Sequence, residues 1–176
     1  ALYRRECCGM LGELPTMLSP EELAACPGVP SEERMAKGRV AVIECVQEIP
    51  CNPCENACRL GAITIGEQIT NLPTLHEEKC TGCGMCVANC PGLAITIIDK
   101  TYSDTEAVIE FPFEYLPLPE VGDTVQAVSR AGEVVCDATV TSVRKIKAYA
   151  GTAVVGIAVP KQFADEVRSM KRLKRA

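Results

Sequence analysis

The sequence predicts a small α+β protein in which a cysteine-rich segment lies between an N-terminal helical extension and a small C-terminal antiparallel β domain that ends in a helix. Three observations support this prediction. The 176 residues include 12 cysteines, no Trp and only three Phe, so aromatic packing is not the main source of cohesion. CRLGAITI at residues 58–65 returns as CPGLAITI at residues 90–97. Apolar and polar residues alternate after residue 121, which is typical of half-buried strands.

The N-terminal extension, residues 1–38, is expected to hold two short helices. In SPEEL, Ser19 is the predicted N-cap and Glu22 completes a capping box. A second helix is expected within residues 31–38, where Ser precedes the helical pattern and Gly follows it. RVAVIE at residues 39–44 then predicts a strand that leads into the cysteine-rich segment.

The cysteines indicate the class of site. Disulfide frameworks are typical of secreted chains, and the sequence shows no run with the features of a secretory signal peptide. No apolar stretch approaches the roughly 20 residues of a membrane-spanning helix. We therefore expect a soluble cytoplasmic protein without a membrane span, whose clustered cysteines hold metal.

One cysteine run is specific enough to name the metal site. Cys80, Cys83, Cys86 and Cys90, followed by Pro91, give CxxCxxCxxxCP, the run with which two-cluster bacterial ferredoxins hold [4Fe-4S] clusters. Zinc is the alternative, but zinc sites usually use two separated CxxC pairs. The glycines in the run let three thiolates converge and let backbone N–H groups point at the cluster.

The repeat predicts a second cluster. A shift of 32 residues aligns Cys51, Cys54 and Cys58 with the last three cysteines of the run. In two-cluster ferredoxins the fourth cysteine of each run binds the other run's cluster. The expected ligand sets are therefore crossed: Cys80, Cys83, Cys86 and Cys58 hold one cluster, and Cys51, Cys54, Cys90 and one further residue hold the other.

That further residue departs from the repeat. Glu48 occupies the position that aligns with Cys80, and Cys45 lies three residues before it. We expect three extra residues in this loop and Cys45 as the closing ligand, because a [4Fe-4S] cluster takes four thiolates. The alternative is that Cys45 is a buried strand thiol and that the site holds a [3Fe-4S] cluster or nothing.

Residues 45–98, within a predicted domain at 39–100, resemble a bacterial two-cluster ferredoxin domain, with CTGCGMCVANCPGLAI as the most specific stretch. The resemblance covers about a third of the chain. It implies two [4Fe-4S] clusters as cofactors, a helix after each cysteine run, and AITI segments that are strands of two small sheets around the clusters.

Residues 101–120 are predicted to be a hairpin and a Pro-rich linker. TYSD lies between ITIIDK and TEAVIEFPF, as expected for a hairpin turn. The three prolines of FPFEYLPLPE argue against continuous strand pairing there.

Residues 121–160 are predicted to be a small, barrel-like β domain, and residues 161–176 a basic C-terminal helix with Phe163, Val167 and Met170 on one face. This last segment has six Lys or Arg against two acidic residues. A nucleic-acid-binding tail is the alternative, but no aromatic residues or recognition module accompany it. We expect a solvated end or a contact with an acidic partner subunit, and no nucleic acid.

Four cysteines and the single histidine fall outside the predicted ligand sets. The spacing of Cys7, Cys8, Cys26 and Cys136 matches no iron–sulfur run, so structural or free thiols are expected. A role of the first three in a further site shared with a partner is the alternative. His76 is expected at the rim of the second site.

The chain shows no features of a substrate-converting enzyme. It has no nucleophile beside a base, no Gly-rich phosphate loop and no flavin or nicotinamide fingerprint, which predicts an electron carrier. IPCNPC, together with the second run and the C-terminal β domain, resembles small ferredoxin-like subunits of FAD-dependent amine and amino-acid dehydrogenases of the proline, opine or hydrogen cyanide synthase type. The resemblance implies a hetero-oligomer with larger flavin-binding subunits that carry FAD or FMN. A free two-cluster ferredoxin and a structural iron–sulfur adaptor are the alternatives.

Overall fold

The computed structural model describes residues 19–149 and 151–174. Its helices are short: α1 Pro20–Ala24, α2 Glu32–Met35, α3 Pro53–Ala57, α4 Met85–Asn89, and the 3-10 turns η1 Glu77–Lys79, η2 Lys147–Tyr149 and η3 Lys161–Phe163. The strands are β1 Val40–Ile43, β2 Ile63–Thr64, β3 Thr74–Leu75, β4 Ile95–Asp99, β5 Glu106–Phe113, β6 Thr124–Ser129, β7 Val134–Arg144, β8 Ala153–Pro160 and β9 Val167–Met170. None of these helices is long and apolar enough to cross a bilayer.

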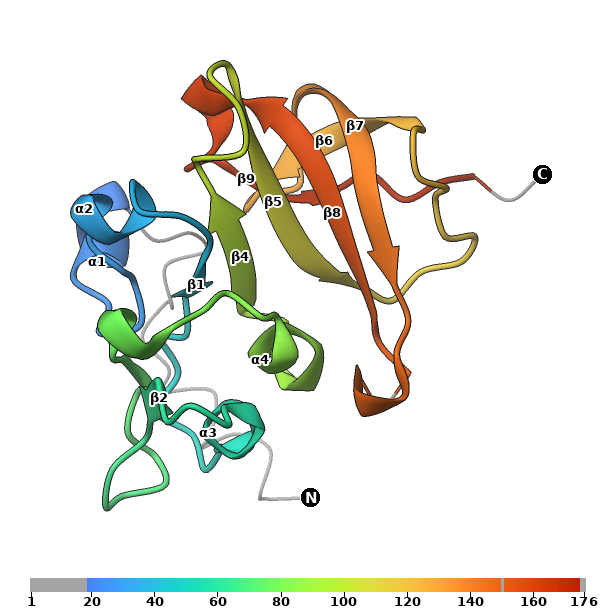
Figure 1. Cartoon of the computed structure of the whole chain (residues 1–176). Coiled ribbons are helices and arrows are strands. Elements are labelled where there is room, and N and C mark those ends of the chain that lie inside the picture. The colour runs from blue at the N-terminus through green and yellow to red at the C-terminus, as the bar shows by residue number, and fades with distance from the viewer. Residues whose placement is uncertain (1–18, 150, 175–176) are drawn as a thin grey trace, which may run out of the picture.

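Side-chain caps begin both N-terminal helices. The Ser19 hydroxyl accepts a hydrogen bond from the Glu22 N–H, and the Glu22 carboxylate accepts one from the Ser19 N–H, so the predicted capping box is confirmed. Ser31 caps α2 by accepting a bond from the Arg34 N–H. Because the two helices have five and four residues, their stability depends on these caps and on packing beside β1 (Figure 1).

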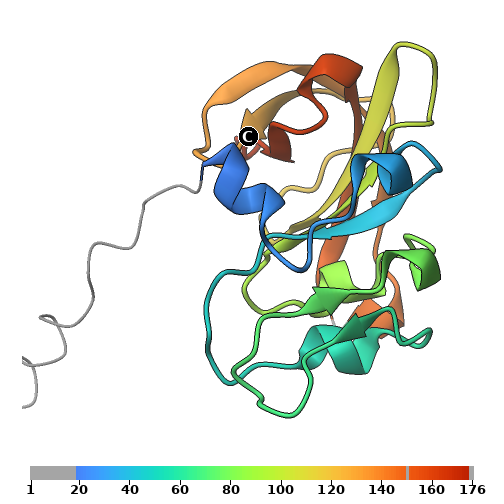
Figure 2. The same cartoon turned by 90° about the vertical axis from the view of Figure 1, so that its left-hand side faces the viewer.

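The two AITI segments lie in different sheets. The first gives β2, which pairs only with β3, with Ile63 opposite Leu75. The second gives β4, which pairs antiparallel with β1 from Val40 opposite Ile98 to Ile43 opposite Ile95. The small sheet, α3 and α4 lie together at one end of the molecule (Figures 1 and 2).

One sheet joins the cysteine-rich segment to the C-terminal part of the chain. Its order is β1-β4-β5-β8-β7-β6-β9, and all the pairings given for it are antiparallel. β4 and β5 form the hairpin across TYSD, and β5 pairs with β8 along its whole length, from Glu106 to Phe113. The strands curl until β9 lies near β5. The fold is therefore mostly β, with the cysteine-rich end built onto one edge of the sheet.

The predicted basic helix at residues 161–176 is wrong. Within the described residues this segment is a 3-10 turn followed by strand β9, which pairs with β6. Val167 and Met170 are 0% and 4% exposed, because they fill the curled sheet instead of one face of a helix. The hydrogen bonds offered by β6 outweigh a helical preference that is weak for a β-branched residue such as Val167.

The Pro-rich stretch is a linker only in part. Phe111 and Phe113 belong to β5 and are buried, and Pro112 lies between them opposite Val154. The unpaired segment begins at Glu114 and contains the exposed Tyr115 and Leu116. Large apolar side chains on alternate positions hold the strand in place despite the proline.

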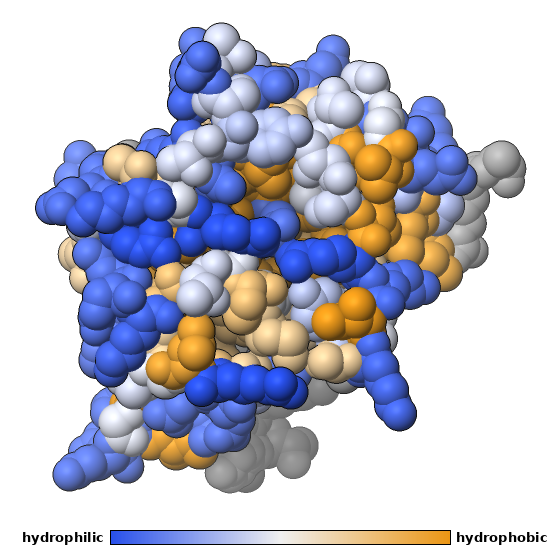
Figure 3. Space-filling model, viewed as in Figure 1, coloured by the Kyte–Doolittle hydropathy of each residue, from blue (hydrophilic) through white to orange (hydrophobic). Residues whose placement is uncertain are grey.

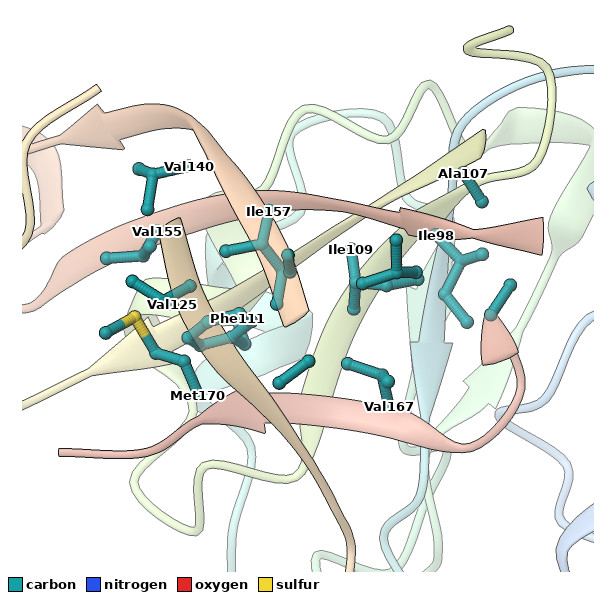
Figure 4. Packing of buried hydrophobic residues seen from close by; sticks show 14 of the residues in the cluster. Ile98, Ala107, Ile109, Phe111, Val125, Val140, Val155, Ile157, Val167 and Met170 are labelled. Carbon is teal, nitrogen blue, oxygen red and sulfur yellow. The ribbon is translucent and has the colours of Figure 1, made fainter. Parts of the chain in front are cut away.

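The core has two parts. The first fills the curled sheet, where Phe111, Val125, Ile157 and Met170 point toward one another (Figure 4). The second lies between β1, β4 and the helices α3 and α4, and includes the completely buried Val87 together with several cysteines. Cysteines thus fill much of this end of the molecule, together with aliphatic side chains and the buried Tyr149.

Candidate metal centre

Four cysteines surround a cavity beside α4, which we call the α4 cavity. Cys86 lies in α4, Cys80 and Cys83 lie in the loop before it, and Cys58 comes from the C-terminal end of α3. The cavity has a volume of about 450 Å³. The remaining wall is mainly apolar, with contributions from Ala41, Ile63, Met85, Ile97 and Ile146. The structure thus brings together one of the two crossed cysteine sets that the sequence predicts.

The other four cysteines line a second cavity, which we call the α3 cavity. Cys54 lies in α3, Cys51 immediately before it, Cys90 at the C-terminal end of α4, and Cys45 in the loop after β1. The neighbouring walls are apolar and include Ile43, Ile65, Pro73, Pro91 and Ile95. Cys45 is therefore beside the other three thiols, despite the irregular spacing of its loop.

The α3 cavity is the tighter of the two, with a volume of about 30 Å³. The loop that closes it, residues 46–50, is exposed at every position and has no regular hydrogen-bonding pattern. This loop contributes no side chain to the buried core.

Backbone N–H groups donate to cysteine sulfurs in both sites. The Ala62 N–H lies 3.2 Å from Cys58 Sγ, and the Ala94 N–H lies 3.4 Å from Cys90 Sγ. These two bonds are equivalent under the repeat of 32 residues. A third donor, the Ala41 N–H, lies 3.4 Å from Cys80 Sγ. Hydrogen bonds of this kind stabilise thiolates and, in iron–sulfur proteins, influence the reduction potential.

The apolar surroundings favour the protonated form of the Cys86 and Cys54 thiols. Burial raises the pKa of Cys86, and the neighbouring Cys80, Cys83 and Cys58 raise it further. Burial likewise raises the pKa of Cys54 to about 11, with Cys90 and Cys51 adding to the shift. Metal coordination deprotonates a thiol outright, so both cavities suit a cationic, thiophilic group and disfavour four bare thiolates.

This donor set fits iron–sulfur clusters. Each cavity offers four sulfurs, the ligand number of a [4Fe-4S] cluster, and soft thiolates select such clusters over metals that prefer oxygen. Among the described residues, no three His, Cys, Asp or Glu side chains converge closely enough to hold a single metal ion. The thiols of a cluster site bind separate iron atoms, so they do not need to meet at one point.

Two glycines shape the loop before α4. Gly82 and Gly84 have φ values of 65° and 83°, a region that favours glycine. A Cβ on Gly82 would lie 2.9 Å from both the carbonyl carbon and the oxygen of Arg39. The absence of a side chain therefore lets the loop lie against the beginning of β1, which brings Cys80 and Cys83 to the cavity.

A charged cluster that the sequence analysis missed lies beside the α4 cavity. The Glu110 carboxylate on β5 is buried and accepts hydrogen bonds from Arg39, at 2.6 Å, and from Arg144. Arg144 also donates to the Cys83 carbonyl at 3.4 Å, and its guanidinium lies over the Tyr149 ring. The signal in the sequence was a single acidic residue within the apolar stretch AVIEFPF.

The remaining sulfur and imidazole groups lie elsewhere. All ten cysteines of the described residues are free thiols. Cys26 donates to the Glu22 carbonyl at 3.4 Å, and Cys136 lies on β7. Cys7 and Cys8 lie outside the described residues. His76 lines neither cavity, and its Nε2 lies 3.0 Å from the Thr64 hydroxyl.

Comparison with known families agrees with this geometry. Residues 73–96 match the 4Fe-4S binding domain. This match includes the whole run from Cys80 to Cys90. The chain therefore contains a ferredoxin-like iron–sulfur segment. No solved structure matches the chain.

Similar proteins include subunits of oxidoreductases. The chain is 48% identical over 48 residues to the polyferredoxin-like subunit of an aliphatic sulfonate oxidoreductase from Pyrococcus furiosus, covering 27% of each protein. It is 45% identical over 49 residues to one of the subunits of an ion-translocating oxidoreductase complex from Methanosarcina acetivorans, covering 28% of this chain and 17% of the relative. A longer match, 31% identical over 118 residues, is to Protein Pixie from Drosophila melanogaster and covers 58% of this chain and 19% of the relative. The chain thus spans about a quarter or less of each relative. The 4Fe-4S match and the likeness to the two oxidoreductase subunits support an iron–sulfur electron-transfer role.

Proposed function

We propose that this protein is an electron-transfer subunit that holds two [4Fe-4S] clusters and relays electrons to or from flavin-bearing partner chains of a dehydrogenase of the amine or amino-acid type. The observation that carries the proposal is the pair of cavities, each lined by four cysteines drawn from both repeats. One set is Cys58, Cys80, Cys83 and Cys86, and the other is Cys45, Cys51, Cys54 and Cys90. A single structural cluster would need only one such site.

The residues of this chain would bind and insulate the clusters. A [4Fe-4S] cluster, when bound, takes up and releases one electron at a time, whereas a flavin can exchange either one electron or two. The eight cysteines supply the ligands, and the N–H groups of Ala41, Ala62 and Ala94 offset the negative charge on three of their sulfurs. The walls of both cavities are mainly apolar, and hydrogen bonding and solvent exposure are among the factors that set a cluster's potential.

The complex is the part of the proposal that rests on resemblance. IPCNPC and the arrangement of domains resemble the small subunits of flavin-dependent dehydrogenases, and two of the similar proteins are named as oxidoreductase subunits. Anaerobic purification from the native host with partners retained, followed by assays of iron, sulfide, flavin and subunit composition, tests it. About eight iron atoms per chain together with larger flavin-bearing chains is the expected result. A lone chain with the same iron content and no flavin would instead identify a diffusible ferredoxin.

The assignment of Cys45 has its own test. We expect Cys45→Ser to lower the iron content per chain and to change the visible spectrum, because the α3 cavity would lose one of four ligands. Cys26→Ser is the matched control, since Cys26 is buried but lines neither cavity. Iron content and spectrum that stay unchanged in Cys45→Ser would show that this residue is not a ligand.

A further inference from the structure

The two cavities differ in the charge of their surroundings. The charged side chains that line the α4 cavity are Arg59 and Lys79, and none of the described residues on its wall is acidic. No charged residue of the described part of the chain lines the α3 cavity. The chain as a whole has a formal net charge of −5. The charge at the α4 cavity is therefore opposite in sign to the net charge of the protein.

The mouth of the α4 cavity also exposes apolar side chains. Leu60 and Ile146, which both line the cavity, are 54% and 49% exposed, and Cys83 is exposed beside them. Figure 3 shows apolar atoms gathered in the lower half of this face, with strongly hydrophilic side chains along their margins. An apolar centre within a charged rim is typical of a surface that binds another protein.

Three segments that are distant in sequence build this face. Arg59 and Leu60 follow α3, Lys79 ends η1, and Ile146 lies just before η2 in the connection between β7 and β8. Lys147 stands between Ile146 and Ala148, the two residues of that connection that line the cavity, and is itself exposed. The C-terminal part of the sheet therefore helps to form the opening that leads to Cys83.

We propose that this face, formed by Arg59, Leu60, Lys79, Ile146 and Lys147 and called here the basic face, docks an electron-transfer protein whose own redox centre is surrounded by acidic side chains. The proposal rests on the proposed function and adds the site and charge of the contact. The apolar centre excludes water between the two redox centres, and the rim selects a partner of opposite charge. In the transfer, one electron leaves the reduced cluster and enters the one-electron acceptor of the partner, and no covalent bond forms or breaks.

The test compares two acceptors of opposite charge. The full-length protein, loaded with clusters and reduced with dithionite that is then removed, is mixed in a stopped-flow instrument with an acidic flavodoxin or with the basic protein cytochrome c. We expect the second-order rate constant for flavodoxin to fall steeply as salt is added, because screening weakens attraction between opposite charges. The acidic remainder of the chain attracts cytochrome c, so its rate constant should not fall when the charges of the basic face are reversed.

Matched charge reversals locate the contact. R59E/K79E changes two charges on the basic face, and K161E/K171E makes the same change in net charge after β8 and after β9. We expect R59E/K79E to lower the flavodoxin rate constant about tenfold at low ionic strength and K161E/K171E to change it less than about twofold. Iron content and the visible spectrum show whether both variants hold their clusters. R59Q/K79Q replaces the reversal if the latter loses iron.

The outcomes separate this proposal from the one on which it rests. Equal losses in the two variants would mean that net charge, and not the basic face, governs the reaction. A flavodoxin rate constant that does not fall as salt is added to the unmodified protein would overturn the docking face while leaving an electron carrier. Clusters that cannot be reduced, or that pass electrons to neither acceptor, would overturn both proposals.

Discussion

At the scale of single residues, the cysteine spacing carried most of the information about the site. Seven of the eight proposed ligands follow from one run and one repeat, and the structure places them around two cavities in the expected crossed sets. Cys45 required the further argument that a cluster takes four thiolates. The N–H donors could not be assigned from the sequence, because any backbone amide can donate and only the folded loop decides which one faces a sulfur.

Glu110 shows why other site residues escaped prediction. Its two arginine partners come from positions 39 and 144, and no local pattern links three residues so far apart in the chain. We expect Glu110→Gln to destabilise the protein by about 1–2 kcal/mol, because the buried position loses its charge-assisted hydrogen bonds to Arg39 and Arg144, whose guanidinium groups remain partly in contact with water. Chemical unfolding monitored by circular dichroism measures this loss. An unchanged midpoint would mean that water replaces the carboxylate without cost.

Gly82→Ala tests the close approach of the cysteine loop to β1. The substitution would place a methyl group against the Arg39 backbone at a residue with positive φ, and we expect a cost of at least about 1 kcal/mol and reduced iron occupancy. Gly92→Ala is the control, since its Cβ would meet nothing within 4 Å and its φ is not in the left-handed region. Iron content per chain after identical anaerobic reconstitution is the measurement. Equal occupancy in the two variants would contradict the strain argument.

At the scale of elements, local signals predicted where chain segments begin and what type they are. Ser19 and Ser31 are the N-caps of α1 and α2, at the positions that the sequence predicts. The segment at residues 161–176 failed because its helical pattern was read in isolation, whereas the unpaired edge of β6 recruits it as a strand. The periodicity of a segment can be read from a single sequence, but the presence of a free strand edge elsewhere in the fold cannot.

Lys100 joins elements at opposite ends of the chain. Its ammonium lies 2.9 Å from both the carboxylate of Glu32, the first residue of α2, and the Asp165 carboxylate before β9. Burial acts to lower the pKa of Lys100, but the hydrogen bonds to Asp165 and Glu32 outweigh it and raise the pKa. The stabilisation is therefore fully present below the unfolded pKa of about 10.4 and is lost as the pH rises through the higher folded value.

We expect Lys100→Met to lower the free energy of unfolding by about 0.5–1 kcal/mol near pH 8, and this difference should shrink as the pH rises above the unfolded pKa of about 10.4. Thermal melts of both proteins across that range provide the measurement. Lys37→Met is the control, because Lys37 pairs only with the exposed Glu33 and should show a smaller effect. A difference that does not depend on pH would exclude titration of Lys100 as its cause.

At the scale of the whole molecule, one sheet runs through segments that the sequence suggested were separate. β5 pairs with β4 on one side and with β8 on the other, and β8 is buried from Ala153 to Val159. The order of strands in this sheet could not be predicted, because the alternating pattern gives the faces of a strand but not its neighbours. Removal of the C-terminal strands would therefore disrupt the sheet to which the cysteine-rich end is joined.

We expect a chain that ends at residue 114 to be insoluble or to lose its iron. Truncation there would expose the edge of β5 and the large apolar side chains of the curled sheet, including Phe111 and Phe113. Soluble yield and iron per chain are the measurements. Residues 115–176 supplied as a second polypeptide should restore both through strand pairing. A soluble, iron-loaded truncated chain would show that the cysteine-rich end folds alone.

The mostly exposed chain between β2 and β3, residues 66–73, is the link between the two repeats. Each cavity draws its thiols from both sides of that link, so each cluster would act as a cross-link between the halves, much as a disulfide does. If a protease cut this link in the loaded protein, both fragments would remain fastened to each other through iron. An intact chain at residues 66–73 would then be needed for the two halves to assemble, but not for them to stay together once the clusters are bound.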